Sequence, residues 1–187
     1  MCGRYRRTTS EEELARRYHI PIPKELDLPI SYNIAPSQKV LTIRFIPQTQ
    51  RRSLDALQWG LVPYWANDPK MAYKTINARL ETVDTAPSYR QAFKKRRCLI
   101  PADGFYEWKK VVGGKIPYSI GMKDNAPFVF AGLWEGWKDP ATQEWLHTCT
   151  ILPGAAMRAW PISPRVNSPK NNDADLLVPV QETIEYG

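Results

Sequence analysis

The sequence predicts a β-dominated α+β fold, a single domain over residues 1–187 with a curved antiparallel sheet or barrel and a few flanking helices. Segments rich in β-branched and aromatic residues follow one another at short spacing, separated by Gly, Pro and Asp/Asn turns. Helical patterns are confined to two short segments. A chain of 187 residues is also long enough to bury one good core, but short for two full-sized domains.

The first expected helix lies within TTSEEELARRY, residues 8–18. Thr9 or Ser10 can cap its N-terminus, three glutamates suit its first turn, and Arg16 and Arg17 suit its last. Three prolines between residues 21 and 29 then predict an extended connection. The second expected helix covers residues 87–97, begins at a proline and ends on a basic cluster.

Strands are predicted wherever apolar and aromatic residues recur between turn signals. The expected strands cover residues 39–45, 54–62, 98–111, 117–122, 127–137 and 144–152, with a turn over 47–52. The tail from Pro153 is proline-rich and is expected to be irregular. The 17 prolines of the chain indicate long loops held by a sheet scaffold.

The chain carries a formal charge of +7, from 26 Lys and Arg against 19 Asp and Glu. This excess favours an anionic partner, of which nucleic acid is the commonest, through the release of condensed counterions. A mildly basic surface also serves solubility alone, and the charge does not decide between the two interpretations.

The three cysteines form no CxxC pair, and the chain has two histidines, His19 and His147. Neither a disulfide framework nor a metal site is therefore expected, and no residue is assigned as a metal ligand. The N-terminal segment has no apolar run. We therefore expect no signal peptide, no membrane anchor and a reducing intracellular location.

Cys2 is a candidate nucleophile because of its position. A small second residue permits removal of the initiator Met1, which would leave a free α-amino group beside the Cys2 thiol. An α-amino group has a pKa of about 7.7–8.0, so a useful fraction is neutral at physiological pH. The amine can attack an aldehyde and the thiol can then close a five-membered thiazolidine ring. Alternatively, the cysteine is accidental and frays with the terminus.

Polar side chains elsewhere could hold a sugar and a phosphate. Arg4 follows a glycine and can bind a phosphate with two N–H groups. Asn77 and Arg79 stand two residues apart in TINARLETV, residues 75–83, so in an extended strand they would face the same way. The competing interpretation, an edge strand with ordinary polar residues, is favoured by the pattern alone.

Two further candidates stand among aromatic residues. Glu107 lies between Tyr106 and Trp108, and a carboxylate flanked by aromatics suits general acid–base catalysis if it is partly desolvated. A solvent-facing glutamate paired with a neighbouring lysine is the alternative. In WGLVPYWAND, residues 59–68, we expect Trp59 in the core and only Trp65 exposed, where it could stack on an unpaired base.

Together these segments resemble one known family, the SOS response-associated peptidase (SRAP) proteins. The resemblance runs in order from Met1 to about Val180. It rests on MCGRY, SYNIAPSQ, WGLVPYWA, INARLET, CLIPADGFYEWK, PYSI, AGLWE and WPISPRVNSPKNND.

The resemblance implies a specific activity. Proteins of this family sense abasic sites in single-stranded DNA and form a thiazolidine crosslink through the mature N-terminal cysteine, in the DNA damage (SOS) response. The match assigns catalytic roles to Cys2, Asn77 and Glu107. It also implies autoproteolytic removal of Met1, hydrolase and lyase-type chemistry, and no cofactor. The expected partner is single-stranded DNA with abasic sites, bound by a monomer in the cytoplasm or at the nucleoid.

The same match assigns DNA contacts. Arg4 and Arg79 would bind phosphates, Trp65 would flank the lesion or stack on a base, and Pro36 would line the wall of the site.

The chain departs from the family pattern after about residue 152. The family has a His-x-Arg-Met-Pro segment there, whose histidine is a second acid–base group, whereas here Leu152 continues into PGAAMRAWPIS. Residues are missing from the sequence, or the protein is a shortened member; the intact blocks on both sides favour the first explanation. We assign no catalytic histidine. A thiol peptidase acting on other proteins and a non-covalent single-stranded DNA-binding module are the alternative functions.

Overall fold

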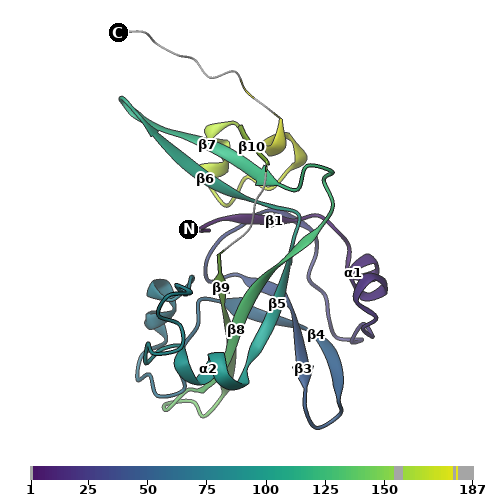
Figure 1. Cartoon of the computed structure of the whole chain (residues 1–187), viewed down its shortest axis with the longest axis vertical. Coiled ribbons are helices and arrows are strands. Elements are labelled where there is room, and N and C mark those ends of the chain that lie inside the picture. Colours follow the sequence, from purple (N-terminus) through teal and green to yellow (C-terminus); the bar gives the residue numbers. More distant parts are fainter. Residues whose placement is uncertain (1, 154–157, 179, 181–187) are drawn as a thin grey trace.

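The computed structural model describes residues 2–153, 158–178 and 180. Five strands form a closed barrel in the order β3-β4-β9-β8-β5, and five others form a second sheet in the order β10-β7-β6-β1-β2. Figure 1 shows the barrel in the lower half of the molecule and the β6–β7 hairpin above it, with β1 between the two. The predicted β-dominated barrel fold is therefore confirmed.

The barrel is built from five strands, along which the side chains point alternately into its interior and towards its surface. The strands are β3 (Lys39–Ile46), β4 (Arg51–Trp59), β5 (Arg97–Ala102), β8 (Phe128–Lys138) and β9 (Trp145–Leu152). Neighbouring strands pair antiparallel except β4 and β9, which pair in parallel through Gln58↔Thr148 and Trp59↔Cys149. This short parallel contact closes the barrel, a detail that the strand pattern does not reveal.

The second sheet combines the β6–β7 hairpin with three shorter strands from distant parts of the chain. Its strands are β1 (Tyr5–Arg7), β2 (Ser31–Ile34), β6 (Gly104–Val111), β7 (Gly114–Gly121) and β10 (Arg158–Pro161). The sequence predicted a single strand over 98–111, but the structure divides it into β5 and β6 at Asp103. The buried Asp103 carboxylate accepts hydrogen bonds from the backbone N–H groups of Thr8 and Thr9, at 2.6 and 2.9 Å. These bonds fix the chain where it passes from the barrel to the second sheet.

The helices lie outside the barrel (Figure 1). Helix α1 (Glu11–Tyr18) is capped by Ser10, whose side chain accepts from the Glu13 N–H, and it ends at His19 in the left-handed conformation. Helix α2 (Arg90–Lys95) is shorter than the predicted 87–97 because the chain is still turning at Tyr89 and β5 begins at Arg97. Short 3-10 helices cover Pro69–Lys74 (η1), Pro164–Asn167 (η2) and Ala174–Leu177 (η3). None of the described helices is long and apolar enough to cross a membrane.

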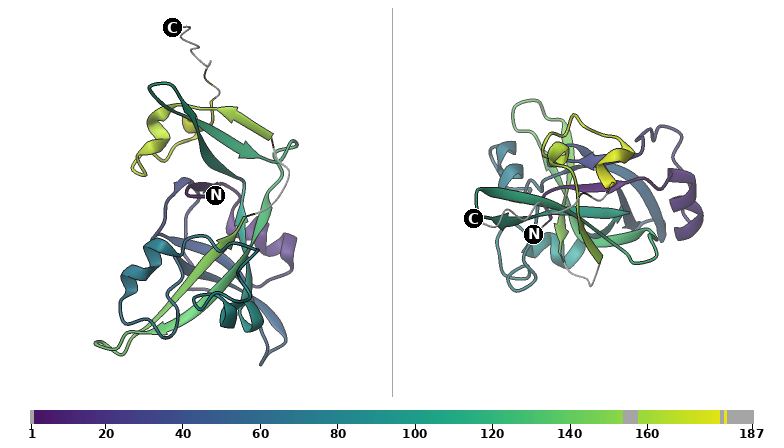
Figure 2. Two further views of the ribbon diagram at one scale, coloured as in Figure 1. Left: turned by 60° about the vertical axis from the view of Figure 1, so that its left-hand side comes forward. Right: turned by 90° about the horizontal axis from the view of Figure 1, so that it is seen from above.

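The barrel interior forms the main core and reaches up to the N-terminal segment. Tyr5 from β1 meets the rings of Trp59 and Phe130 edge to face, at 5.3 and 6.0 Å between centroids. Cys2 belongs to the same buried cluster. Strand β1 therefore covers one end of the barrel, and it carries the chain's first residues over the apolar interior (Figure 2).

Candidate active site

Cys2 is buried rather than frayed, with 2% of its surface exposed. Its thiol donates a hydrogen bond to the Arg4 carbonyl at 3.7 Å. Burial raises the pKa of this thiol to about 12; the nearby Glu107 carboxylate also raises it, whereas the Arg4 hydrogen bond and a positive α-amino group lower it. Met1, whose removal is expected, lies outside the described residues. With Met1 attached, the thiol is thus almost fully protonated at neutral pH.

This burial predicts slow alkylation of Cys2 in the folded chain that retains Met1. Because the thiolate is the nucleophile, iodoacetamide at pH 8 should label Cys2 far more slowly than it labels the urea-unfolded chain. Labelling should accelerate as the pH rises from 9 towards 12, where the folded thiol begins to ionise. Peptide mass spectrometry separates Cys2 from the two other buried cysteines, Cys98 and Cys149. Equal rates in the folded and unfolded chains would contradict this account of the thiol.

Asn77 holds the backbone of Cys2. Its side-chain Nδ2 donates to the Cys2 carbonyl at 2.6 Å, and an isolated bridge pairs Asn77 with Ile151 of β9. The Asn77 Oδ1 atom is buried and has no hydrogen-bond partner among the described residues. An orphaned buried acceptor is costly, so this oxygen is suited to receive a donor that arrives with the mature terminus or with a ligand.

The segment after Asn77 is not the predicted strand. It is a single bridge followed by turns from residue 80, with Arg79 exposed. Asn77 and Arg79 nevertheless line one cavity of about 530 Å³, together with Ala78, Leu80, Glu81, Thr82 and Pro153. The structure therefore brings the two predicted residues to a common opening, although not by the strand alternation expected from the sequence.

Tyr89 is a supporting residue that the sequence reasoning missed. Its hydroxyl donates to the Asn77 carbonyl at 3.1 Å, so α2 and its N-terminal turn fix the backbone that carries the amide. The sequence offered no signal for this contact, since Tyr89 stands in a segment assigned to a helix for its pattern alone.

Glu107 reaches the site from the second sheet. It lies on β6 one residue after Tyr106, which is fully buried against Ile162, Val166 and Leu176 on the opposite face. Side chains alternate along a strand, so Glu107 shares its face with Phe105, which packs against the cluster containing Cys2. Its carboxylate contributes to the raised pKa of the Cys2 thiol, after burial, through its charge. The Glu107 side chain lines a different cavity from that of Asn77, together with Trp108, Lys109 and Tyr118.

Arg4 has mainly internal partners. Its Nη1 atom donates to Asn33 Oδ1 at 2.9 Å and to the Val166 carbonyl at 2.7 Å. Asn33 in turn donates to the carbonyls of Ser168 and Asn171, at 2.9 and 2.7 Å. This network ties the SYNIAPSQ and PISPRVNSP segments to the N-terminus, so a phosphate could reach only the remaining N–H groups of Arg4. Asn33 is a central residue of the site that the sequence reasoning did not single out.

The aromatic loop between β4 and η1 is only partly as predicted. Trp59 is fully buried, as expected, and Trp65 is 46% exposed with its indole N–H 3.4 Å from the Pro87 carbonyl. The expectation that only Trp65 would be exposed was wrong, because Tyr64 is 57% exposed. Pro36 is half-buried and follows Ile34, a member of the apolar cluster around Cys2, by two residues.

Both histidines lie away from this site. His19 ends α1, and His147 on β9 stacks with Trp145 at a centroid distance of 6.5 Å, in a pocket lined by other residues. The described residues contain no group of three or more His, Cys, Asp and Glu side chains that could hold a metal ion. The arrangement therefore offers a buried thiol, an amide and a carboxylate at one end of the barrel.

Comparisons with known proteins agree with the resemblance. The family model described as "SOS response associated peptidase (SRAP)" matches residues 1–169. The abasic site processing protein YoaM of Bacillus subtilis is 37% identical over 225 aligned positions, covering 95% of this chain and 97% of that protein. YoqW of Bacillus subtilis, also an abasic site processing protein, is 44% identical over 155 positions, covering 81% and 67%.

A solved structure of a protein from Bacteroides thetaiotaomicron superposes with a TM-score of 0.71 at 23% identity, covering 94% of this chain and 85% of that one. This likeness supports the fold, and the family match rests on the sequence. The chain belongs to the SOS response associated peptidase (SRAP) family.

Proposed function

We propose that this protein captures abasic sites in single-stranded DNA by forming a covalent thiazolidine with the mature N-terminal Cys2. The observation that carries the proposal is the hydrogen bond from Asn77 to the Cys2 carbonyl, beside a cavity and within the field of Glu107. A terminus held in this way keeps an amine and a thiol at a fixed place, which is the main requirement for two successive attacks on one carbon. The names of the relatives YoaM and YoqW support abasic sites as the substrate.

The reaction begins with the amine. Once Met1 is removed, the neutral α-amino group of Cys2 attacks the aldehyde carbon of the ring-opened deoxyribose and forms a carbinolamine. Loss of water, with a proton delivered to the departing hydroxyl, gives the Schiff base. Glu107 is the acid–base group for these proton transfers.

The thiol completes the capture. The Cys2 sulfur adds to the imine carbon, its proton passes to the nitrogen, and the five-membered ring closes without a leaving group. The raised pKa of the thiol keeps it neutral while the amine reacts. A proton on the imine nitrogen would place a positive charge beside the thiol and lower that pKa again, which favours ring closure.

We expect contacts to the DNA from Arg79 at this cavity and from further residues outside it. Arg79 is exposed beside Asn77 and is placed to bind a phosphate. Trp65 offers an exposed ring for an unpaired base next to the lesion. Pro36 would form part of the wall, and Arg4 would act chiefly by fixing the terminus and secondly through its remaining N–H groups.

The chain is also proposed to be shortened after Leu152. The alignment with YoaM spans 225 positions, more than the 187 residues of this chain, so part of YoaM has no counterpart here. Residues 154–157, at the proposed junction, lie outside the described part of the chain. Because no histidine lies beside Cys2 in the described structure, peptidase action on other proteins is less well supported than capture of an aldehyde.

A denaturing gel tests the proposed function. Purified protein that begins at Cys2 is mixed with single-stranded DNA bearing one abasic site, with intact DNA of the same sequence as the control. We expect a shifted, heat-stable band that requires the lesion. A shift with both DNAs, or with neither, would contradict the proposal.

We expect Asn77→Ala to slow adduct formation about a hundredfold, because a misplacement of about 1 Å in a reacting group has an effect of that size. The change removes the donor to the Cys2 carbonyl, while the exposed Gln48→Ala in the β3–β4 turn serves as a matched control. Single-turnover rates on the same gel measure the effect. If Asn77→Ala reacted as fast as the wild type, Asn77 would have no positioning role.

A further inference from the structure

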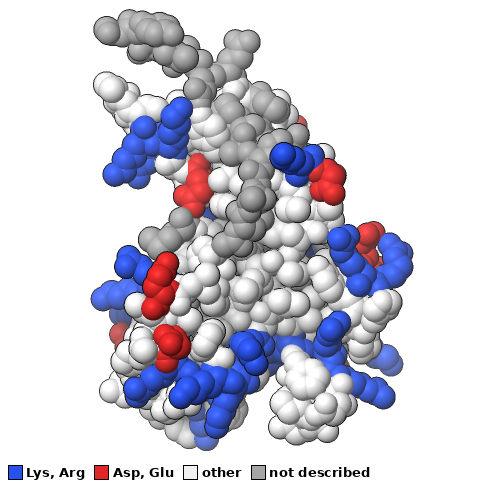
Figure 3. Space-filling model, viewed as in Figure 1, with Lys and Arg blue, Asp and Glu red and all other residues white. Residues whose placement is uncertain are grey.

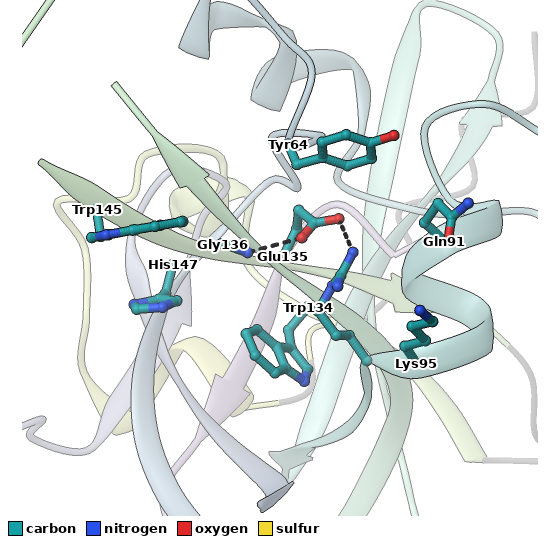
Figure 4. A pocket seen from close by; sticks show the side chains of 9 residues that line it. Tyr64, Gln91, Lys95, Trp134, Glu135, Gly136, Trp145 and His147 are labelled. Atoms are coloured by element: carbon teal, nitrogen blue, oxygen red, sulfur yellow. Dashed lines mark hydrogen bonds and ion pairs between the residues drawn. The ribbon is translucent and has the colours of Figure 1, made fainter. Parts of the chain in front are cut away.

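A second pocket of about 700 Å³ lies on the outside of the barrel, away from Cys2. It is formed by the β4–η1 loop, α2 and the far ends of β8 and β9. Its lining residues are Tyr64, Gln91, Lys95, Arg96, Trp134, Glu135, Gly136, Trp145 and His147. Figure 4 shows Tyr64 on one side of this pocket and Trp145 over His147 on the other.

Four of its lining residues carry aromatic rings, which are Tyr64, Trp134, Trp145 and His147. The rings of Trp145 and His147 stack with their planes 11° apart, and the ring centroids of Trp134 and His147 lie 6.1 Å apart. Gly136 faces His147 across the β8–β9 pair, and a Cβ there would meet the Trp145 and His147 rings at 3.4–3.5 Å, an ordinary van der Waals distance, so both rings lie directly over this position. Trp145 is 64% exposed and Tyr64 57%, so both rings present open faces to solvent.

The charge around this pocket is positive. Helix α2 and the start of β5 contribute four exposed cations, which are Arg90, Lys94, Lys95 and Arg97. Blue side chains gather over the α2 region in Figure 3. Glu135 is the one carboxylate among the lining residues, and it is paired with Arg96 at 2.7 Å and accepts from the Gly136 N–H at 3.1 Å. The pocket thus has exposed rings beside exposed cations.

Two connections relate this pocket to the Cys2 site. Ile151, which bridges Asn77, and His147 stand four residues apart on β9, which is about 13 Å of strand. Tyr64 in the pocket is also the neighbour of Trp65, the proposed lesion-flanking aromatic, on a single loop. If Trp65 flanks the lesion, a strand that passes it would therefore come near Tyr64 and this pocket.

We propose that this pocket is a second subsite for single-stranded nucleic acid, in which a base away from the lesion stacks on Trp145 or Tyr64 while lysines of α2 bind its phosphates. The combination of open aromatic faces and a cationic rim is the one that binds unpaired strands without sequence preference. The inference extends the proposed function, since it gives the strand around a captured lesion a further point of attachment.

The test uses intact DNA, so that it is independent of covalent capture. In a Cys2→Ala background, fluorescence anisotropy measures the affinity for oligothymidylates of about 4 and about 16 nucleotides. We expect Trp145→Ala and Tyr64→Ala each to weaken binding of the longer strand by about tenfold. The exposed Tyr73→Ala, outside the pocket, should leave binding unchanged, and equal melting temperatures check that each variant folds.

Charge is tested separately. Lys94→Gln together with Lys95→Gln should lower the slope of log affinity against log salt by about 1–2, as expected when two phosphate contacts are lost. Unchanged affinity in both aromatic variants would overturn the subsite, even if the gel shows lesion capture. Weakened binding in these variants would support the subsite even if the capture reaction failed.

Discussion

Cys2→Ala is expected to abolish the heat-stable adduct with abasic DNA. Alanine at position 2 also permits removal of Met1 and leaves a free α-amine, so the variant can still form a Schiff base but cannot close the ring. A Schiff base hydrolyses reversibly, whereas a thiazolidine adds a second bond to the same carbon. We therefore expect the band in the variant to appear only when borohydride reduces the imine.

The control for this experiment is Cys98→Ala. Cys98 is a buried barrel cysteine in the same apolar cluster as Cys2, with a pKa also raised by burial. Its loss removes a thiol of similar environment without touching the terminus, so adduct formation should persist. A heat-stable band from Cys2→Ala without reductant would show that another residue forms the crosslink.

Glu107→Gln is expected to give the second largest effect, a fall of about a hundredfold or more in the rate of adduct formation. A positioned acid–base group contributes a factor of about 10²–10⁴ to such a step. Glutamine keeps the shape of the side chain but can neither take up nor release the proton. Binding of intact DNA should change little. Single-turnover kinetics measure the rate of adduct formation, and anisotropy measures the binding.

Glu25→Gln is the matched control for this variant, because Glu25 is exposed in the connection between α1 and β2. It removes the same charge from the protein without touching the site. If both substitutions slowed the reaction equally, net charge rather than proton transfer would explain the effect.

The long strands of the barrel were predictable because alternation and turn residues are local signals. β3 was expected at 39–45 and spans Lys39–Ile46, and β9 was expected at 144–152 and spans Trp145–Leu152. Helix α1 was predicted from its capping residues, and the structure selects Ser10 as the N-cap.

Strands β1, β2 and β10 of the second sheet were not predicted, since each is short and depends on partners far away in the sequence. β1 has three residues and is held by pairing with β6, through Tyr5↔Phe105, and with β2, through Tyr5↔Ile34. A three-residue segment carries too little pattern to be distinguished from a loop. The break between β5 and β6 has the same origin, because Asp103 is fixed by Thr8 and Thr9.

The candidate site was predictable to the extent that chemistry shows in residue type and position. Cys2, Asn77 and Glu107 were singled out from the sequence; the structure joins Asn77 to Cys2 by a hydrogen bond, whereas Glu107 is related to Cys2 only through the effect of its charge on the thiol pKa. The contacts that hold them were not predictable. Tyr89 and Asn33 donate hydrogen bonds to backbone carbonyls, at Asn77 and Val166 respectively. Every residue has such a carbonyl, so the sequence does not show which one is bonded.

The most direct test of the central claim is mass spectrometry of the protein–DNA adduct after digestion of both components. The account predicts that the modification lies on the peptide that begins at Cys2, with the deoxyribose remnant bound to both the α-nitrogen and the sulfur. Such a peptide has no free thiol and no free terminal amine, and it resists borohydride. A modification on a lysine, or a Cys2 peptide that still reacts with iodoacetamide, would contradict thiazolidine formation at Cys2.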